Sequence, residues 1–599
     1  MLQFQNSVRT RYLSYSFLLY LASVSVLPNL ALAQDTNLDW VSFDRSQFDG
    51  NAALDTEGNV QVFWKTGDNY STYGVASRSE GYLALGFSET GAMTGADIAV
   101  GYRNSDGEFV LENRHATDFV TPELSDDQTN NIRLREGSQE NGVTAFVFEK
   151  KNRADCLENQ VDVSTDSWQW FIYAFSDENT FAQHGPGHNG KKYIKLGTGT
   201  TISVNEIRDI DGAQNFTIAQ PEMTIPTQET TYCYTLHKLP EGNKNFILGE
   251  RPSSSSDLLH HLVVYACYDL PDSAKSMVGE DPNCDFENFS NPCTGFVTEW
   301  APGMTGRTFE PGFGKPFGSD SYEYVMFETH YNNPDGLDDV SATAAYTFLY
   351  NDDQVDTEIG TLTLGDYQVE GWTLEPGQPL VPHSTVCTPE CTSRWPSAGI
   401  TAVSVFFHMH QRGVNQHVQI IRDGVEISPL ASIRSFEYGY QFSKSIAEVQ
   451  LLPGDKLITI CEFDTSADDT PVPGGLASRD EMCFAWVDYY PANGVIVCSQ
   501  LDLGQAPDNP LNGTAALCLD AYNDSMPIYP SDQIDASFTP LEERGNACDV
   551  SGDATTDEAP SSAGPAGASP TTGSASLSKG LPVLFGAVVV AATALLVTC

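Results

Sequence analysis

Five histidines and one methionine in the middle of the chain have the types and spacing of metal ligands. They are His260, His261, His330, His408, His410 and Met482. Imidazole binds zinc, copper, iron and nickel alike, whereas a thioether is soft and favours Cu(I) over Zn(II). A hydrolytic zinc site would more often show an HExxH helix, and the chain contains no such sequence. The set therefore predicts copper and redox chemistry rather than hydrolysis.

Strand geometry decides which of these side chains can share an ion. In a β-strand, residues i and i+2 face the same side, so His408 and His410 can both point at one ion. The adjacent His260 and His261 would face opposite sides of a regular strand. They can share an ion only where the backbone turns or one ring reaches round. Taken singly, an HxH pair, an HH pair or a methionine that could fill a core gap is a weak signal, and the joint pattern is much more specific.

Four motifs that contain these residues occur in one order. They are His260–Cys267, Glu328–Pro334, His408–His410 and Glu481–Cys483. With these motifs and its cysteines, the chain over about residues 216–535 resembles the copper type II, ascorbate-dependent monooxygenase family, in its dopamine beta-hydroxylase-like branch. The resemblance implies two jelly-roll-like sandwiches, each with one copper, that face each other across a solvent cleft.

The resemblance also implies two copper ions per chain with different roles. The first ligand group is His260, His261 and His330, and the second ligand group is His408, His410 and Met482. The first would hold an electron-transfer copper, because all-nitrogen ligation suits an ion that cycles between Cu(II) and Cu(I). The second would be the catalytic group, because its thioether stabilises the Cu(I) that must meet O2. Ascorbate would be the reductant, and one oxygen atom would enter an sp3 C–H bond while the other leaves as water.

Residues beside the second ligand group bear on the substrate. The peptide-amidating branch of the family grips a substrate carboxylate with an Arg before the HxH motif and an Asn and a Tyr after the Met. This sequence has Phe406, Phe484 and Trp486 there, so peptide amidation is not expected. These rings favour an apolar or aromatic substrate, or else they pack in the core. An amine substrate would need a carboxylate nearby, and Asp488 is the candidate. We therefore predict hydroxylation of a small aromatic or amine substrate.

The N-terminus and the composition indicate the secretory pathway. Arg9 and Arg11 precede an apolar run and small residues up to Ala33, so residues 1–33 are predicted to be a signal peptide. Five N-glycosylation sequons follow, at Asn69, Asn215, Asn288, Asn512 and Asn523. The net charge of −49 argues against a nucleic-acid partner, because phosphates attract basic patches. The expected partners are O2 and a small-molecule substrate, and a homodimer stays open.

Thirteen cysteines fit an oxidising compartment. Cys599 ends an apolar tail and is expected to be removed, which leaves twelve, and sequence alone cannot assign their pairing. The resemblance implies six bridges, namely Cys156–Cys548, Cys233–Cys284, Cys267–Cys293, Cys387–Cys498, Cys391–Cys518 and Cys461–Cys483. Two of them would lie next to copper ligands, at Cys267 and Cys483, and would hold the ligand strands in register.

Short alternating apolar segments with glycine-rich breaks predict an all-β fold. Residues 40–198 resemble a DOMON domain, an immunoglobulin-like β-sandwich. Residues 216–365 and 366–535 are expected to be the jelly-roll-like N-terminal and C-terminal copper sub-domains. Residues 550–580 are rich in Ser, Ala, Gly and Pro and predict a disordered stalk. Residues 581–599 are apolar and uncharged, so they predict a GPI signal or a single-pass membrane anchor at the extracellular face.

Other functions fit parts of the sequence. Some DOMON domains bind sugars, or haem through a Met and a His such as Met93 and His184; the same residue types occur in DOMON domains without haem, so none is expected here. Asp97, with Asp127, is a candidate for binding a hard cation. One alternative is therefore a cell-surface sugar- or haem-binding protein with an inactive copper core, and another is a zinc or copper storage protein. The complete six-residue ligand set favours the enzyme.

Overall fold

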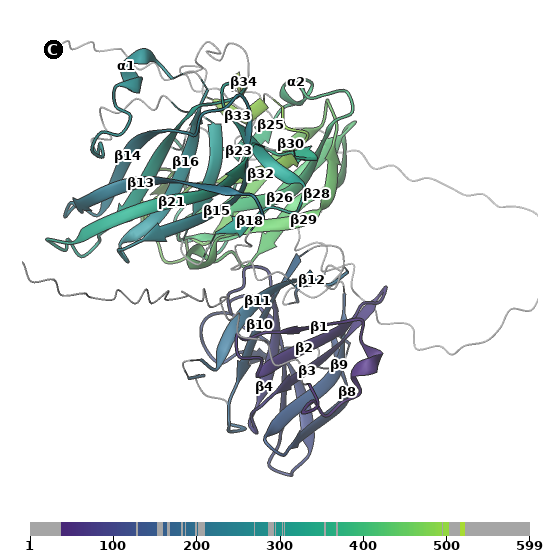
Figure 1. Cartoon of the computed structure of the whole chain (residues 1–599). Coiled ribbons are helices and arrows are strands. Elements are labelled where there is room, and N and C mark those ends of the chain that lie inside the picture. Colours follow the sequence, from purple (N-terminus) through teal and green to yellow (C-terminus); the bar gives the residue numbers. More distant parts are fainter. Residues whose placement is uncertain are drawn as a thin grey trace, which may run out of the picture. The chain divides into compact units, whose positions relative to one another are not determined.

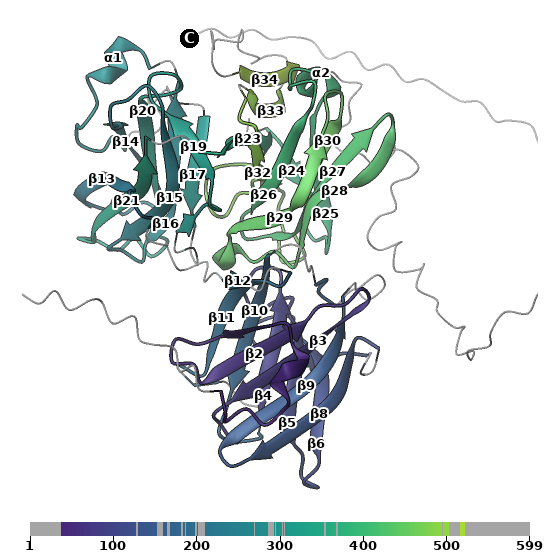
Figure 2. The same ribbon diagram turned by 45° about the vertical axis from the view of Figure 1, so that its right-hand side comes forward.

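The computed structural model describes residues 38–501 and 516–521, except for short gaps. The gaps are residues 127, 129, 153–159, 164–167, 181–183, 186, 198–199, 202–209, 269, 285–292, 294, 302–303, 305, 353–354, 367–368, 370 and 494. The described residues form mostly β-strands, with helical turns only at η1 (Arg45–Gln47), α1 (Asp272–Lys275), α2 (Pro389–Thr392) and η3 (Tyr438–Tyr440) (Figure 1, Figure 2). The prediction of an all-β fold is confirmed.

The region predicted to be a DOMON domain consists of two sheets that share one core. The first sheet has the spatial order β1 (Gly50–Ala53), β2 (Val60–Lys65), β3 (Tyr70–Ser77), β9 (Val143–Lys151) and β8 (Ile132–Glu140). The second has the order β12 (Thr200–Thr201), β11 (Asn189–Lys195), β10 (Trp168–Phe175), β4 (Leu83–Ser88), β5 (Asp97–Arg103), β6 (Phe109–His115) and β7 (Glu123–Leu124). Alternate residues such as Val60, Val62, Leu83 and Leu85 meet in this core, as the period of two in a strand requires.

An ion pair is buried between these two sheets. Lys150 Nζ of β9 lies 2.6 Å from Asp97 Oδ2 of β5, and neither side chain is exposed. Asn131 Nδ2 lies 3.2 Å and 3.0 Å from the two Asp97 carboxylate oxygens. The Lys150 ammonium therefore takes the place at Asp97 that was a candidate for a hard cation. Asp127, the other residue of that hypothesis, lies outside the described residues.

In the N-terminal sub-domain, two sheets again share a core. One has the order β13 (Gln214–Thr224), β21 (Ser341–Asn351), β15 (Asn245–Ser254), β19 (Phe313–Phe317) and β22 (Thr357–Glu358), with β18 (Arg307–Thr308) beside β15. The other has the order β14 (Thr230–Lys238), β20 (Tyr324–Asn332), β16 (Leu259–Cys267) and β17 (Gly295–Trp300). Leu262, Val264 and Phe327 of the four-stranded sheet pack into the core with Phe348. The opposite, outer face of this sheet is left to other side chains.

The C-terminal sub-domain is built from two larger sheets and a strand pair. The first sheet has the order β29 (Ser443–Leu451), β26 (Ile400–His408), β32 (Phe484–Tyr490), β23 (Gly360–Gly365), β33 (Val495–Leu501) and β34 (Ala516–Ala521). The second has the order β25 (Val381–Cys387), β30 (Lys456–Phe463), β27 (Gly413–Arg422) and β28 (Val425–Arg434), and the pair is β24 (Thr373–Leu374) with β31 (Val472–Pro473). Because β23 pairs with β32 and β33, the boundary between the sub-domains lies before Gly360 rather than at the expected position 365/366.

Several predicted features lie outside the described residues. They are the signal peptide 1–33, the stalk 550–580, the tail 581–599, the sequons at Asn288, Asn512 and Asn523, and the bridge Cys156–Cys548. The sequon residues Asn69 and Asn215 are described, and both are exposed, as glycan attachment requires. Within the part of the chain that the structure describes, no helix has the length and apolar character needed to cross a membrane.

Candidate copper centres

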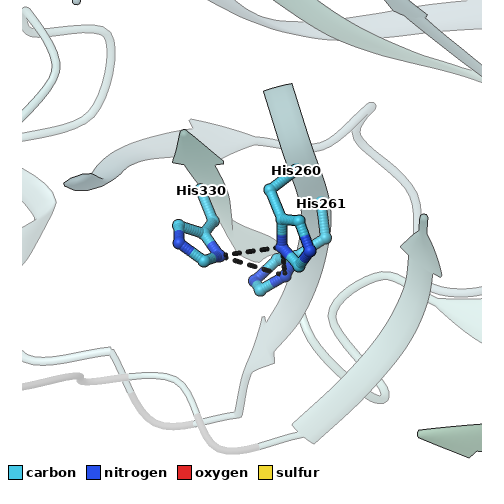
Figure 3. A group of neighbouring side chains, drawn as sticks. All are labelled: His260, His261 and His330. Atoms are coloured by element: carbon cyan, nitrogen blue, oxygen red, sulfur yellow. Dashed lines mark hydrogen bonds between the residues drawn. The ribbon is translucent and has the colours of Figure 1, made fainter. Parts of the chain in front are cut away.

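A β-bulge brings the first ligand group together. His261 of β16 and His330 of β20 are directly paired, so their side chains share the outer face of the four-stranded sheet. The register shifts between Leu259 and His261, which makes His260 the extra residue of a bulge. The bulge turns the His260 ring toward the other two rings, so that two adjacent histidines converge on one point (Figure 3).

The geometry of the first ligand group fits a metal ion. Nδ1 of His260 lies 3.1 Å from Nδ1 of His261 and 3.1 Å from Nδ1 of His330, and the latter two atoms are 3.3 Å apart. Nitrogen ligands about 2.0 Å from an ion lie roughly 3.3 Å apart in a tetrahedral arrangement. Burial lowers the pKa of His260 to about 2 and that of His261 to about 3, so both rings are neutral, as metal ligands must be.

Hydrogen bonds fix the tautomers of the two histidines in the second ligand group. Nδ1 of His408, at the end of β26, donates to Oε1 of Gln441 at 2.7 Å, and Nδ1 of His410 donates to the carbonyl of Asp480 at 3.0 Å. With Nδ1 protonated, each ring keeps the lone pair of Nε2 for a metal. Nε2 of His410 is buried, and no described residue forms a hydrogen bond with it. A buried nitrogen without a protein partner suits a metal ligand.

Met482 is held beside this histidine pair by its two neighbours in the chain. The Glu481 carboxylate accepts hydrogen bonds from the backbone N–H groups of His410 at 3.0 Å and Arg412 at 2.8 Å. On the other side, Cys483 forms a disulfide with Cys461. The Met482 side chain is buried and lines the same cavity as the second-group histidine at the end of β26. A thioether placed there suits Cu(I).

The two ligand groups lie close together. The ring centres of His261 and His408 are 6.3 Å apart, and those of His260 and His410 are 6.4 Å apart. Tyr438 of η3 stacks on His260 at a ring-centre distance of 5.0 Å, and its hydroxyl contacts Nε2 of the same ring. Side chains of the two sub-domains therefore meet between the ligand groups, where the resemblance implied an open solvent cleft.

A cavity of about 420 Å³ is lined by members of both ligand groups. The predicted pocket residues Phe406, Phe484 and Trp486 all line it. Trp486 stacks on Phe484 at 5.1 Å and on Phe296 of β17 at 4.5 Å, with interplanar angles of 9° and 12°. A concave cavity of this size with aromatic side chains in its wall suits a small ligand with an apolar ring.

Asp488, which we expected to receive an amine, does not line this cavity. Its carboxylate lies 2.9 Å from Lys315 Nζ and 3.0 Å from Arg307 Nη1, both from the N-terminal sub-domain. Burial alone would raise the pKa of Asp488, but the charges of Lys315 and Arg307 outweigh it and hold the pKa well below its ordinary value. The Asp488 charge is therefore matched within the protein and is not available to a substrate.

Three residues of the site have no role predicted from the sequence, namely Gln441, Tyr438 and Glu328. Glu328 lies in one of the family-like motifs, which is a signal that could have identified it. It is 3.4 Å from Nε2 of His261, it is hydrogen-bonded by Tyr234 and Tyr265, and burial raises its pKa to about 7. Gln441 and Tyr438 belong to a loop without a motif, so only the folded chain shows that they reach the ligand groups.

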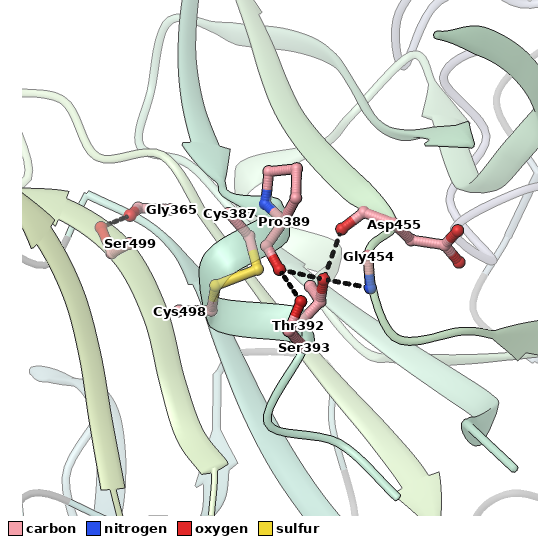
Figure 4. The surroundings of a disulfide bond; sticks show 9 residues. All are labelled: Gly365, Cys387, Pro389, Thr392, Ser393, Gly454, Asp455, Cys498 and Ser499. Carbon is pink, nitrogen blue, oxygen red and sulfur yellow. Dashed lines mark hydrogen bonds between the residues drawn. A yellow bond between two sulfur atoms is a disulfide. The ribbon is translucent and has the colours of Figure 1, made fainter. Parts of the chain in front are cut away.

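Four of the six implied disulfides are formed between described residues. They are Cys233–Cys284, Cys267–Cys293, Cys387–Cys498 and Cys461–Cys483. Cys387–Cys498 joins β25 to β33, and beside it Thr392 of α2 donates a hydrogen bond to the carbonyl of Asp455 at 2.7 Å (Figure 4). Cys391 is disulfide-bonded too, and the side chain of Cys518 lies outside the described residues. The neighbouring sulfurs of Cys387, Cys391 and Cys498 are therefore not free thiolates for a metal.

Known families match the chain in three places. A DOMON domain matches residues 56–176, and the copper type II ascorbate-dependent monooxygenase N-terminal and C-terminal domains match residues 216–338 and 357–504. Together with the two ligand groups, these matches define a copper type II ascorbate-dependent monooxygenase that carries a DOMON domain in front of its copper domains.

Among its relatives, the chain is distantly similar to DBH-like monooxygenases. It is 27% identical to human DBH-like monooxygenase protein 1 over 469 residues, which cover 75% of this chain and 74% of the relative. It is 26% identical to Caenorhabditis briggsae tyramine beta-hydroxylase over 459 residues, covering 74% and 76%. It is 24% identical to human dopamine beta-hydroxylase over 465 residues, covering 75% and 74%.

Proposed function

We propose that this monooxygenase uses both ligand groups, with two copper ions and ascorbate, to hydroxylate an sp3 C–H bond of a small aromatic or amine substrate with O2, in the manner of dopamine beta-hydroxylase. The observation that carries the proposal is one cavity lined by members of both ligand groups and by Phe406, Phe484 and Trp486. No Arg or Lys is among the described residues that line it, so none of these residues offers a cation to pair with a carboxylate. That absence disfavours a peptide substrate with a free C-terminus.

The two ligand groups are proposed to divide the work. Copper, when bound, supplies one-electron redox chemistry, with ascorbate as the source of electrons. The first ligand group, with nitrogen ligands alone, would serve electron transfer, and the second, with the Met482 thioether, would serve the reaction with O2 and substrate. Gln441 and the Asp480 carbonyl hold the protons on Nδ1 of His408 and His410, which keeps Nε2 of each ring a ligand. In this proposal the aromatic rings of the cavity wall would shield the reacting C–H bond from water.

Copper stoichiometry and oxygen uptake test the proposal. The full chain should bind two copper ions, measured by atomic absorption, and consume O2 with ascorbate and 2-phenylethylamine. His408→Ala and His330→Ala should each lose one copper and the coupled hydroxylation, because each removes a ligand from one group. His188→Ala changes a histidine that stacks on Phe175 in the DOMON domain and serves as the control. Retention of both coppers in His408→Ala would contradict the assignment of the second ligand group.

A binding protein with an inactive copper core is the alternative. It is disfavoured because the converging nitrogens of His260, His261 and His330 and the fixed tautomers of His408 and His410 serve no purpose without metal. If the chain were a haem-binding protein instead of a copper enzyme, its absorption spectrum would show a Soret band and ascorbate-dependent O2 uptake would be missing.

The cellular location of the enzyme is the secretory pathway, as its disulfides and its relation to dopamine beta-hydroxylase indicate. We further propose that residues 581–599 direct it to the extracellular face of the cell, through a GPI anchor or a single membrane span. Release from intact cells by a phosphatidylinositol-specific phospholipase would support the GPI anchor, and resistance to it would support the span.

A further inference from the structure

A row of side chains crosses the outer face of the four-stranded sheet, next to the first ligand group. In register across β14, β20, β16 and β17, the row is Tyr234, Glu328, Val263 and Glu299. Side chains that lie directly opposite each other in antiparallel strands point to the same face, and all four of these line the cavity. Two buried carboxylates therefore face the space in which the substrate is proposed to bind.

The two carboxylates differ in their partners. Glu328 is hydrogen-bonded by Tyr234 and Tyr265, and it lies close to the ring of His261. Glu299 is only 4% exposed, and none of the described residues forms a hydrogen bond with its buried Oε1. Buried polar atoms without a partner are rare in folded proteins, and each requires an explanation. Because this one lies at the wall of a binding cavity, a ligand is the direct explanation.

The charges around Glu299 do not balance. Arg307 pairs with Glu250 and, at 3.0 Å, with Asp488, while Lys315 lies 2.9 Å from Asp488. Two cations thus face three carboxylates, which leaves one negative charge, and Glu299 is the carboxylate for which the described residues provide no ion pair. Burial raises the pKa of Glu299 to about 7, although the nearby Arg307 opposes this. The unmatched charge lies at the cavity wall.

We propose that Glu299 determines substrate specificity: its carboxylate receives the ammonium group of an aryl-alkyl amine whose ring packs against Phe296 and Trp486. This rests on the proposed function, because it names the substrate class of the same site. Phe296 lies on β17 with Glu299, and Trp486 stacks on Phe296, so acidic and aromatic surfaces adjoin in one cavity. An ammonium group supplies the missing cation and donates charge-assisted hydrogen bonds to the carboxylate.

Binding calorimetry on the full chain tests this assignment without turnover. The probes are 2-phenylethylamine and its neutral analogue 2-phenylethanol, each titrated anaerobically into copper-loaded and copper-free protein, so that coordination of the amine to copper is separated from its pairing with Glu299. The wild type should prefer the amine. Glu299→Gln, which keeps the shape and removes the charge, should weaken amine binding about 10- to 100-fold and change alcohol binding by about twofold at most.

Matched variants keep the test specific. Glu323→Gln changes an exposed carboxylate just before β20 and should leave both affinities unchanged. Glu299→Asp keeps the charge and should keep the preference for the amine, with weaker binding. Equal loss of both ligands in Glu299→Gln, or unchanged amine affinity, would overturn the assignment. Failure of the proposed function would appear separately, as absence of ascorbate-dependent O2 uptake in a wild-type chain that still prefers the amine.

Discussion

The DOMON domain and the N-terminal sub-domain each bury a carboxylate, and they treat it in opposite ways. Asp97 is enclosed between two sheets with Lys150 at 2.6 Å and with Asn131 on both of its oxygens. Glu299 is almost as deeply buried, but its Oε1 lacks a hydrogen-bond partner among the described residues. Both carboxylates are buried, so what distinguishes them is whether a cation or a hydrogen-bond donor of the protein pairs with them. A matched carboxylate serves the fold, whereas an unmatched one at a cavity wall serves a ligand.

The largest expected effect comes from removing the cation in the DOMON domain. Lys150→Met leaves Asp97 buried and uncompensated, so the domain should lose about 3–5 kcal/mol of stability. Hydrogen exchange of the β9 amides in the full chain would measure the loss. Lys151→Met, at the next residue of the same strand, is the control because its side chain is only partly buried. A cost below about 1 kcal/mol would show that the pair does not serve the fold.

A smaller effect is expected when pH changes the charge of Glu299. Because burial raises its pKa to about 7, the carboxyl is mostly neutral below that pH and ionised above it, while the amine stays cationic throughout. Amine affinity should therefore rise about tenfold from pH 6 to pH 8. Glu328 faces the same cavity and also titrates near pH 7, so the comparison needs Glu299→Gln, in which most of the rise should disappear. An equal rise in the variant would assign the titration to another group.

The smallest expected effect is on stability, and its sign is the point of interest. The folded-state pKa of Glu299 lies above its ordinary value of 4.5, so its ionisation costs stability as pH rises through about 7. At pH 8, Glu299→Gln should therefore stabilise the copper-free chain by about 1 kcal/mol, and at pH 5 the gain should shrink. Denaturant unfolding midpoints would measure both. If Glu299→Gln instead destabilised the chain at pH 8, the Glu299 carboxylate would stabilise the fold, as is expected of Asp97.

The sequence predicts both ligand groups, because metal ligation demands particular residue types in particular spacings, and the His260, His261 and His330 nitrogens do converge in the fold. Asp488 lies in β32 two positions beyond Trp486, and therefore on the same face of the strand, and Trp486 does line the cavity. The sequence alone could not show that Lys315 and Arg307 of the other sub-domain reach the Asp488 carboxylate. No sequence motif points to Glu299. Its proposed role follows from the arrangement of the neighbouring strands, which only the folded chain shows.

The adjacent histidines show a second limit of sequence reasoning. The alternation rule correctly states that a regular strand cannot aim His260 and His261 at one ion, and it therefore requires a local irregularity. The rule does not say which irregularity occurs, because a backbone turn, a side chain that reaches round the strand and a β-bulge would all satisfy it. The register shift at β16 settles that point, and it rests on pairing with β20, some seventy residues further along the chain.

The same bulge has a consequence for the wall of the cavity. Before it, Leu259 faces the core; after it, the core-facing residues are Leu262 and Val264, so the alternation of β16 has changed from odd to even numbers. One inserted residue thus reverses the sidedness of the strand from that point on, and this is why Val263 faces the cavity in line with Glu299. Deleting His260 would therefore remove a ligand and leave a regular strand with its present sidedness, whereas straightening the strand around a retained His260 would turn it inside out, with apolar residues toward the substrate and His261 toward the core.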